Sequence, residues 1–125
     1  MKNILITGGA GFVGSHICLS LLEGNYNIFV ADTFVNSSKT VFDSIKKICK
    51  NNKNLNNKEI FIYEGDIRDE SFLRKIFEQA EKNQMPIHGV IHCAGLKAVR
   101  ESISNPLMYW DVNVNGSINL FKIMN

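Results

Sequence analysis

The sequence predicts an α/β fold in which helices cover both faces of a parallel sheet. Two observations carry this prediction. Short apolar runs alternate with helix-length amphipathic segments along the chain, as in sheets whose strands are joined by crossover helices. Glycine-rich or acidic turns follow several of these runs directly, which is typical of strands that end at one ligand-binding edge. The 125 residues suffice for one modest core, so one domain or part of one is expected.

The first predicted strand covers Asn3 to Thr7 and leads into the run GGAGFVG at residues 8–14. The strand is short and apolar, as expected of a strand buried on both faces. After the glycines, a helix with one apolar face is predicted, and Gly24 gives its end. The residues assigned to that face are Val13, Ile17, Leu21 and Leu22.

The second predicted strand, Ile28 to Ala31, closes at Asp32. The segment from Lys39 to Lys58 then holds six lysines and one acid. Such a segment is either a phosphate-binding patch or the solvated outer face of a helix followed by an Asn-rich loop. An apolar stripe at helical spacing favours the solvated helix; its residues are Val41, Phe42, Ile45, Ile48 and Cys49.

The third and fourth predicted strands run from Ile60 to Tyr63 and from Ile87 to His92. Between them, Asp69 is expected to cap a helix. The apolar residues of that helix recur at helical spacing; they are Phe72, Leu73, Ile76, Phe77 and Ala80.

A last helix is predicted to reach the C-terminus, with Asn105 as its N-cap and Pro106 at its first position. Its apolar residues are Leu107, Trp110, Val114, Ile118 and Phe121. A sheet of four strands leaves one edge of the fourth strand unpaired and this helix without all its partners, so a homodimer or larger assembly is expected. The expected inventory is about four strands and four helices, an incomplete Rossmann-type doubly wound sheet.

The glycine run carries the strongest chemical signal. Gly9-x-Gly11-x-x-Gly14, which also satisfies Gly8-x-x-Gly11-x-x-Gly14, lies between a strand and a helix, where a pyrophosphate can approach bare backbone and the helix N-terminus. Asp32, 18 residues after Gly14, is placed to accept hydrogen bonds from ribose hydroxyls and to repel a 2′-phosphate, so NAD is favoured over NADP. The alternatives are a simple tight turn and an ordinary capped strand end.

Two further stretches follow the third and fourth predicted strands. Asp66 and Ile67 are expected to meet an adenine, the carboxylate accepting from its amine and the isoleucine packing on its ring. The small residues from Cys93 to Gly95 would let a ribose and pyrophosphate cross the backbone, and Lys97 is within reach of an oxygen of either. The alternatives are a turn-forming aspartate and a surface lysine.

The composition excludes several other classes. An apolar fraction of 45%, a charged fraction of 21% and a net charge of +2 are typical of cytoplasmic globular proteins and lack the basic excess of nucleic-acid binders. The apolar runs are too short to span a membrane. Cys18, Cys49 and Cys93 are widely spaced, so neither a disulfide framework nor a metal site is expected.

Several motifs together resemble a known family. TGGAGFVGSH, DTFVNS, EGDIRD, IHCAGLKAVRES and NPLMYWDVNVNGS are similar to the extended short-chain dehydrogenase/reductase family and, within it, to the UDP-glucose 4-epimerases. The resemblance implies NAD as cofactor. The contacts that it implies are Gly8, Gly11, Phe12, Val13, Gly14, Asp32, Thr33, Asn36, Ser37, Asp66, Ile67, Cys93, Ala94, Gly95, Leu96, Lys97 and Asn113.

The resemblance also implies a UDP-sugar substrate, a transient 4-keto sugar and a Tyr-x-x-x-Lys pair in the complete enzyme. Tyr26, Tyr63 and Tyr109 have no lysine four residues later. We therefore name no catalytic residue, and expect residues 1–125 to be the N-terminal part of the NAD-binding domain, without a substrate domain and inactive alone. Another nucleotide-sugar dehydratase or decarboxylase, and a non-catalytic nucleotide-binding module, are the alternatives.

Overall fold

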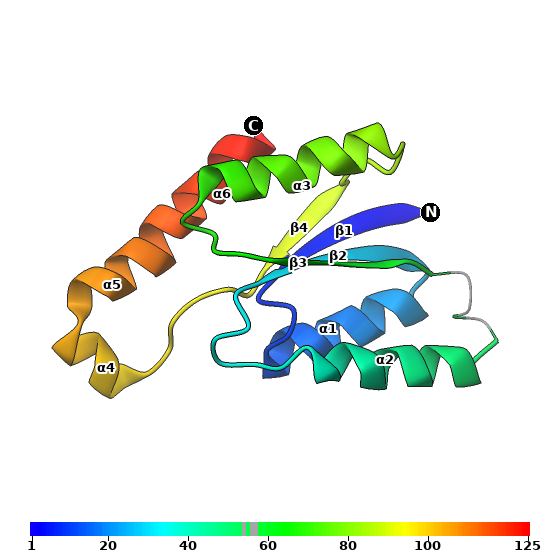
Figure 1. Ribbon diagram of the computed structural model, residues 1–125, viewed down its shortest axis with the longest axis horizontal. Coiled ribbons are helices and arrows are strands. Elements are labelled where there is room, and N and C mark those ends of the chain that lie inside the picture. The colour runs from blue at the N-terminus through cyan, green and yellow to red at the C-terminus, as the bar shows by residue number, and fades with distance from the viewer. Residues whose placement is uncertain (54, 56–57) are drawn as a thin grey trace.

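A computed structural model of the chain, described at residues 1–53, 55 and 58–125, contains one four-stranded parallel sheet (Figure 1). Its strands are β1 (Lys2–Thr7), β2 (Tyr26–Asp32), β3 (Ile60–Glu64) and β4 (Gly89–His92). The spatial order is β3-β2-β1-β4, so the chain reverses its winding direction between β1 and β4. This topology confirms the predicted fold class and places a switch point beside the end of β1.

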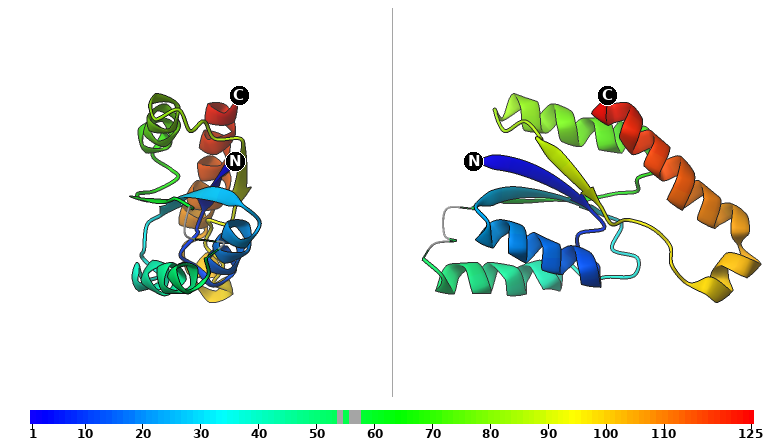
Figure 2. Two further views of the ribbon diagram at one scale, coloured as in Figure 1. Left: turned by 90° about the vertical axis from the view of Figure 1, so that its right-hand side faces the viewer. Right: turned by 180° about the vertical axis from the view of Figure 1, so that it is seen from behind.

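Helices form a layer on each face of the sheet (Figures 1 and 2). One layer holds α1 (Phe12–Glu23) and α2 (Thr40–Asn51), and the other holds α3 (Glu70–Lys82) and α6 (Gly116–Met124). The short helices α4 (Val99–Ser104) and α5 (Pro106–Trp110) lie beyond the carboxyl edge of the sheet. A π-helical turn, η1 (Asp111–Asn115), joins α5 to α6.

The core consists of two clusters, one on each face of the sheet. Ile6, Ile28 and Val30 pack toward α1 and α2, whereas Leu5 and Phe29 pack toward α3 and α6. All five side chains are at most 1% exposed. Adjacent strand residues therefore enter opposite clusters, as the side-chain alternation of a strand requires. β1 is buried on both faces as predicted, and β2 is as well.

The buried face of helix α1 differs from the predicted one. Its fully buried residues are Gly14, Cys18 and Leu22, while Val13 is 53% exposed, so the assignment of Val13 to the core-facing stripe was wrong. A Cβ at residue 14 would overlap the Gly8 carbonyl oxygen. The helix therefore packs with its glycine against the glycine loop, which turns Val13 away from the core.

The region after β4 also departs from the prediction. A separate helix, α4, precedes Pro106, and the last helix contains a π turn, so the estimate of four helices was too low. Asn105 occupies the N-cap of α5 with proline next to it, as predicted, although its side chain makes no capping hydrogen bond. Asp69 does cap α3, accepting from the Phe72 N–H at 3.2 Å.

The lysine-rich segment forms α2, with Phe42, Ile45 and Cys49 buried, which confirms the predicted amphipathic helix. Its lysines at 46, 47 and 50 are exposed. Asn54, Asn56 and Asn57, which belong to the predicted Asn-rich loop, lie outside the described residues.

Side-chain amides join the strands at the amino edge of the sheet. Asn27 Nδ2 donates to Asn3 Oδ1 at 3.0 Å, and the Glu59 N–H donates to Asn27 Oδ1 at 3.1 Å. Asn3 Nδ2 donates to the Pro86 carbonyl at 3.0 Å, and the Asn3 N–H donates to His88 Nδ1 at 3.1 Å. Asn3 and Asn27 are 3% and 8% exposed, so this amide ladder, as we call it, is buried and saturated.

Candidate functional site

A cavity of about 530 Å³ opens at the carboxyl edge of the sheet, around the ends of β1, β2, β3 and β4. Its volume falls within the usual range for small-molecule sites, roughly 300–1,000 Å³. The cavity wall contains every residue for which a cofactor contact was predicted except Asn113. Residues that the sequence did not single out complete the wall: Ala31, Val35, Gly65, Arg68, Ala98, Glu101, Met108 and Val112.

Three glycines of the loop after β1 meet three different steric demands. Gly8 has φ +67°, and a Cβ there would lie 2.7 Å from the Ala94 backbone nitrogen, so the loop needs glycine both for its conformation and for its approach to the β4 loop. Gly14 allows α1 to pack against Gly8. A Cβ at Gly11 would meet only the Gly8 carbonyl, at 3.4 Å, so the bare backbone at Gly11 faces open space in the cavity wall.

The N-terminus of α1 begins at this bare backbone. Gly11 is the N-cap and offers no side-chain cap, so the first-turn N–H groups remain for a partner outside the helix. The helix dipole favours an anion at this point. Phe12 and Val13, 83% and 53% exposed, flank the opening.

Asp32 connects the glycine loop to the loop after β2. Its Oδ2 accepts from the Ala10 N–H at 3.0 Å, and its Oδ1 accepts from the Phe34 N–H at 2.9 Å and from Ser37 Oγ at 3.4 Å. The carboxylate thus organises two loops while it also lines the cavity. The strand-end role that the sequence left as an alternative is therefore present, together with the position expected of a ribose acceptor.

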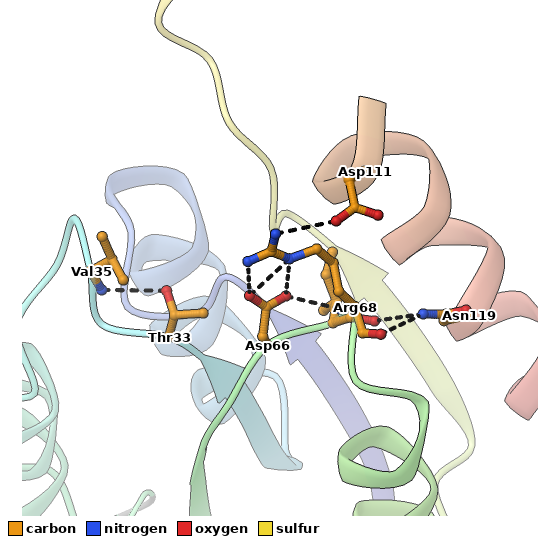
Figure 3. A network of polar contacts seen from close by, with 7 residues as sticks. Thr33, Val35, Asp66, Arg68, Asp111 and Asn119 are labelled. Atoms are coloured by element: carbon orange, nitrogen blue, oxygen red, sulfur yellow. Dashed lines mark hydrogen bonds and ion pairs between the residues drawn. The ribbon is translucent and has the colours of Figure 1, made fainter. Parts of the chain in front are cut away.

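The loop after β3 places Asp66 and Ile67 on the same cavity. Figure 3 shows the Asp66 side chain beside Arg68. Ile67 is 5% exposed and packs on Gly116, where a Cβ would lie 2.7 Å from its Cδ1. Asp66 pairs with Arg68, a residue that sequence reasoning missed. That pair lowers the pKa of the Asp66 carboxyl through the Arg68 hydrogen bonds, so the group is ionised near neutral pH.

The loop after β4 is held by the last helix. Asn113 Oδ1 accepts from the Leu96 N–H at 2.8 Å, and Asn113 Nδ2 donates to the Leu96 carbonyl at 3.0 Å. Both polar ends of the amide are engaged with the loop, so Asn113 supports the cavity wall from behind and is absent from its lining, and its contact with a cofactor stays a prediction. Its neighbour Val112 lines the cavity instead.

A buried polar chain lies beneath the same loop. The Ala94 N–H donates to Thr7 Oγ1 at 3.2 Å, and Thr7 Oγ1 in turn bonds His92 Nδ1. His92 Nε2 lies 2.9 Å from Ser117 Oγ, which donates to the Asn113 carbonyl at 2.6 Å. Burial lowers the pKa of His92. A neutral ring with its proton on Nε2 satisfies every member of this chain.

The thiols and possible metal ligands show no further centre within the described ranges. Cys18, Cys49 and Cys93 are free, and burial raises the pKa of Cys18 to about 12. Among the residues that the structure describes, no group of three or more His, Cys, Asp or Glu could hold a metal ion. No helix in that part of the chain is long and apolar enough to cross a bilayer.

The chain is similar to known UDP-glucose 4-epimerases. The chain is 44% identical over 124 residues to the enzyme of Neisseria meningitidis serogroup A and 41% identical over 123 residues to UDP-glucose 4-epimerase 2 of Arabidopsis thaliana. These matches include 98–99% of the residues of this chain, but the chain spans only 33% of the length of each relative. The resemblance predicted from the motifs is thereby confirmed.

Solved structures agree with the sequence relatives. The Bifidobacterium longum UDP-glucose 4-epimerase in complex with NAD⁺ and UDP superposes with a TM-score of 0.85 at 35% identity, over 98% of this chain and 33% of that one. The Stenotrophomonas maltophila enzyme with bound NAD gives 0.83 at 32% identity, over 99% and 33% of the two chains. A family model described as GDP-mannose 4,6 dehydratase matches residues 5–125. The chain therefore belongs to the GDP-mannose 4,6 dehydratase family.

Proposed function

We propose that this chain is the NAD-binding part of a UDP-glucose 4-epimerase. The observation that carries the proposal is the bare backbone at Gly11, which faces the cavity at the N-terminus of α1 while Asp32 lines the same cavity. A pyrophosphate needs the first feature and an unmodified adenosine ribose needs the second. We propose on the same grounds that residues 1–125 form the N-terminal part of the cofactor-binding domain.

The residues present fit NAD along the whole cavity. The first-turn N–H groups of α1 would hold the pyrophosphate, and Asp32 the adenosine ribose hydroxyls. Asp66 and Ile67 would meet the adenine, and the wall from Cys93 to Lys97 would carry the other nucleotide half. When bound, NAD supplies a hydride acceptor for the C4 position of a sugar. In the complete enzyme, the sugar would belong to a UDP-sugar that passes through a transient 4-keto form.

The family model carries the name of a dehydratase, so a second nucleotide-sugar reaction competes with epimerisation. The epimerase is favoured because the relatives at 41–44% identity are named UDP-glucose 4-epimerases. The chain spans one third of their length and contains no Tyr-x-x-x-Lys. We accordingly propose that these 125 residues bind the cofactor and do not turn over a UDP-sugar alone, because losing a general base costs about 10²–10⁴ in rate.

Cofactor choice tests the proposal. The Arg68 guanidinium on the cavity wall is already paired with Asp66 and Asp111, so it does not neutralise Asp32. In calorimetric titrations, NAD should bind the chain at least about tenfold more tightly than NADP, the scale of one charge-assisted hydrogen bond plus like-charge repulsion. Asp32→Asn, which removes the charge and keeps one of the two acceptor oxygens that hold the loops, should narrow that gap. Equal affinities in the unmodified chain would count against the assignment.

We also propose that the complete protein is a cytoplasmic homodimer. Several apolar side chains of α4, α5 and the last helix are strongly exposed: Ile103 by 77%, Leu107 by 82%, Trp110 by 65% and Phe121 by 60%. Large apolar side chains exposed on neighbouring helices are typical of an interface, and a second copy would cover them helix to helix. Light scattering at micromolar concentration should give a mass above one chain, and a monodisperse monomer would contradict the proposal.

A further inference from the structure

The loop between β3 and α3 holds the side chains of Asp66 and Arg68 against each other on the cavity wall (Figure 3). Arg68 Nη2 donates to Asp66 Oδ2 at 2.7 Å, and Arg68 Nε lies 3.1 and 3.2 Å from Oδ2 and Oδ1. The Arg68 backbone N–H also donates to Oδ1, at 2.9 Å. The guanidinium plane and the loop backbone together fix one orientation of the carboxylate.

The Asp66 carboxylate has more acceptor positions than the N–H groups that reach it. An ionised carboxylate offers about four acceptor positions. Three N–H groups, all from Arg68, make four contacts with it, because the Nε–H is shared between the two oxygens. When the shared N–H turns to one oxygen, one acceptor position on the other is open to a ligand. The Asp66 side chain is 33% exposed and lines the cavity, so a ligand can reach that position. A single free acceptor suits one N–H of an exocyclic amine and repels a carbonyl oxygen in the same place.

Arg68 is itself anchored at its far end. Its Nη1 donates to Asp111 Oδ2 at 3.2 Å, and Asn115 Nδ2 holds the other Asp111 oxygen at 3.0 Å. Asn119 Nδ2 donates to the Arg68 carbonyl at 2.9 Å. The π turn and α6 therefore hold both the side chain and the backbone of Arg68, and the guanidinium cannot leave Asp66 without breaking contacts at both ends.

Stability alone is a weak explanation for this arrangement. The Arg68, Asp66 and Asp111 side chains are 41%, 33% and 48% exposed, and ion pairs that exposed add little to folding. The chain contains a useful comparison, the Arg74–Glu70 pair within α3, which makes one contact at 3.1 Å. Arg74 lies outside the cavity lining, so only the Arg68 pair is placed to act on a ligand.

We infer that Arg68 is a positioning residue that makes the cavity selective for adenine, by orienting Asp66 with one acceptor position free for the exocyclic amine. The inference rests on the proposed function, because it concerns the adenine end of the same NAD site. It predicts that Arg68 matters for the choice between two bases more than for binding as such.

The test compares two dinucleotides that differ only at C6 of the purine and in the proton that hypoxanthine carries on the adjacent N1. NAD carries the adenine amine, whereas nicotinamide hypoxanthine dinucleotide carries a carbonyl there. The unmodified 125-residue chain should prefer NAD by about tenfold, the scale of one exposed charge-assisted hydrogen bond. Arg68→Ala should reduce this preference to about twofold, mostly through weaker NAD binding. Arg68→Lys should restore part of the preference for NAD, because lysine keeps the positive charge but lacks the paired N–H donors of the guanidinium. Arg74→Ala should leave the preference unchanged.

Circular dichroism shows whether each variant folds. If Arg68→Ala does not fold, Asp111→Asn takes its place. This variant weakens only the contact between Asp111 and the Arg68 guanidinium, and it should reduce the preference for NAD over the hypoxanthine dinucleotide by about half. An unchanged preference in a folded Arg68→Ala, with normal NAD binding by the unmodified chain, would overturn this inference alone. Failure of the unmodified chain to bind either dinucleotide would overturn the proposed function, and the inference with it.

Discussion

The two edges of the sheet differ in whether their polar groups are hydrogen-bonded within the chain. At the amino edge, Asn3 and Asn27 carry a buried amide ladder that links β1 and β2 to residues just before β3 and β4, and each side-chain polar atom of the two residues has a partner within the chain. At the carboxyl edge, glycines keep the backbone bare, and the helix N-terminus at Gly11 has no side-chain cap. One edge is completed by the protein itself and the other needs a ligand. Substitutions at the two edges should therefore separate stability from binding.

The largest effect is expected at Gly11. Gly11→Val would place a branched side chain in the open space beside the α1 N-terminus, where the pyrophosphate approaches. NAD affinity should fall by at least about 100-fold, the loss of two or more charge-assisted hydrogen bonds. The melting temperature should change little, because the backbone there is extended (φ −70°, ψ 174°).

Calorimetry and thermal denaturation measure the two quantities for Gly11→Val. Gly89→Ala, at the start of β4, is the matched control, since its Cβ would make only an ordinary 3.4 Å contact with Ile4. Undiminished NAD binding by Gly11→Val would mean that the glycine loop is only a tight turn.

The amino edge should respond in the opposite sense. Asn27→Leu keeps the approximate volume but removes the partners of Asn3 Oδ1 and of the Glu59 N–H. Unsatisfied buried groups cost about 1–3 kcal/mol each, so the free energy of unfolding from urea titration should drop by about 2–4 kcal/mol. NAD affinity of the folded fraction should stay the same.

Asn105→Ala is the control for Asn27→Leu, because the Asn105 side chain makes no capping bond and its loss should stay within about 0.5 kcal/mol. A large loss of NAD affinity in folded Asn27→Leu would break the separation of the two edges.

The smallest effect concerns His92, which lies at the carboxyl edge but is partly buried. Its pKa is lowered in the folded protein, so the unfolded chain binds more protons below about pH 6.5. Folding stability should therefore decline as pH falls from about 6.5 toward the lowered pKa, by up to about 1.4 kcal/mol per pH unit for one proton.

Urea titrations at pH 7.5 and 5.5 test this decline. His92→Gln, which cannot titrate, should remove this part of the pH dependence. An identical dependence in both proteins would show that other groups are responsible.

Local features of the sequence predicted most of the sheet and part of the site. The glycine spacing, Asp32 at the end of β2 and the apolar runs each depend on neighbouring residues, and the structure bears out the strands and helix α3. Contacts across long separations could not be read this way. Arg68 meets Asp111 over 43 residues, and Asn113 meets Leu96 over 17, both through a π turn for which the sequence offered no signal. The exposure of Val13 likewise depended on how closely Gly14 packs against Gly8.

One helix, from Pro106 to Met124 through the π turn, supplies Asp111 and Asn119 to the loop after β3, and Asn113 and Ser117 to the loop and strand end at β4. Both rims of the cavity are thus fastened by a segment that follows all four strands in the chain. The β1–β2 and β2–β3 pairings need only earlier residues, whereas the β4–β1 pairing closes a loop of more than 80 residues and forms slowly by comparison. The first three strands can therefore pair during synthesis before the site can hold its final shape, so competence to bind ligand arises only after the helix that begins at Pro106 has been made.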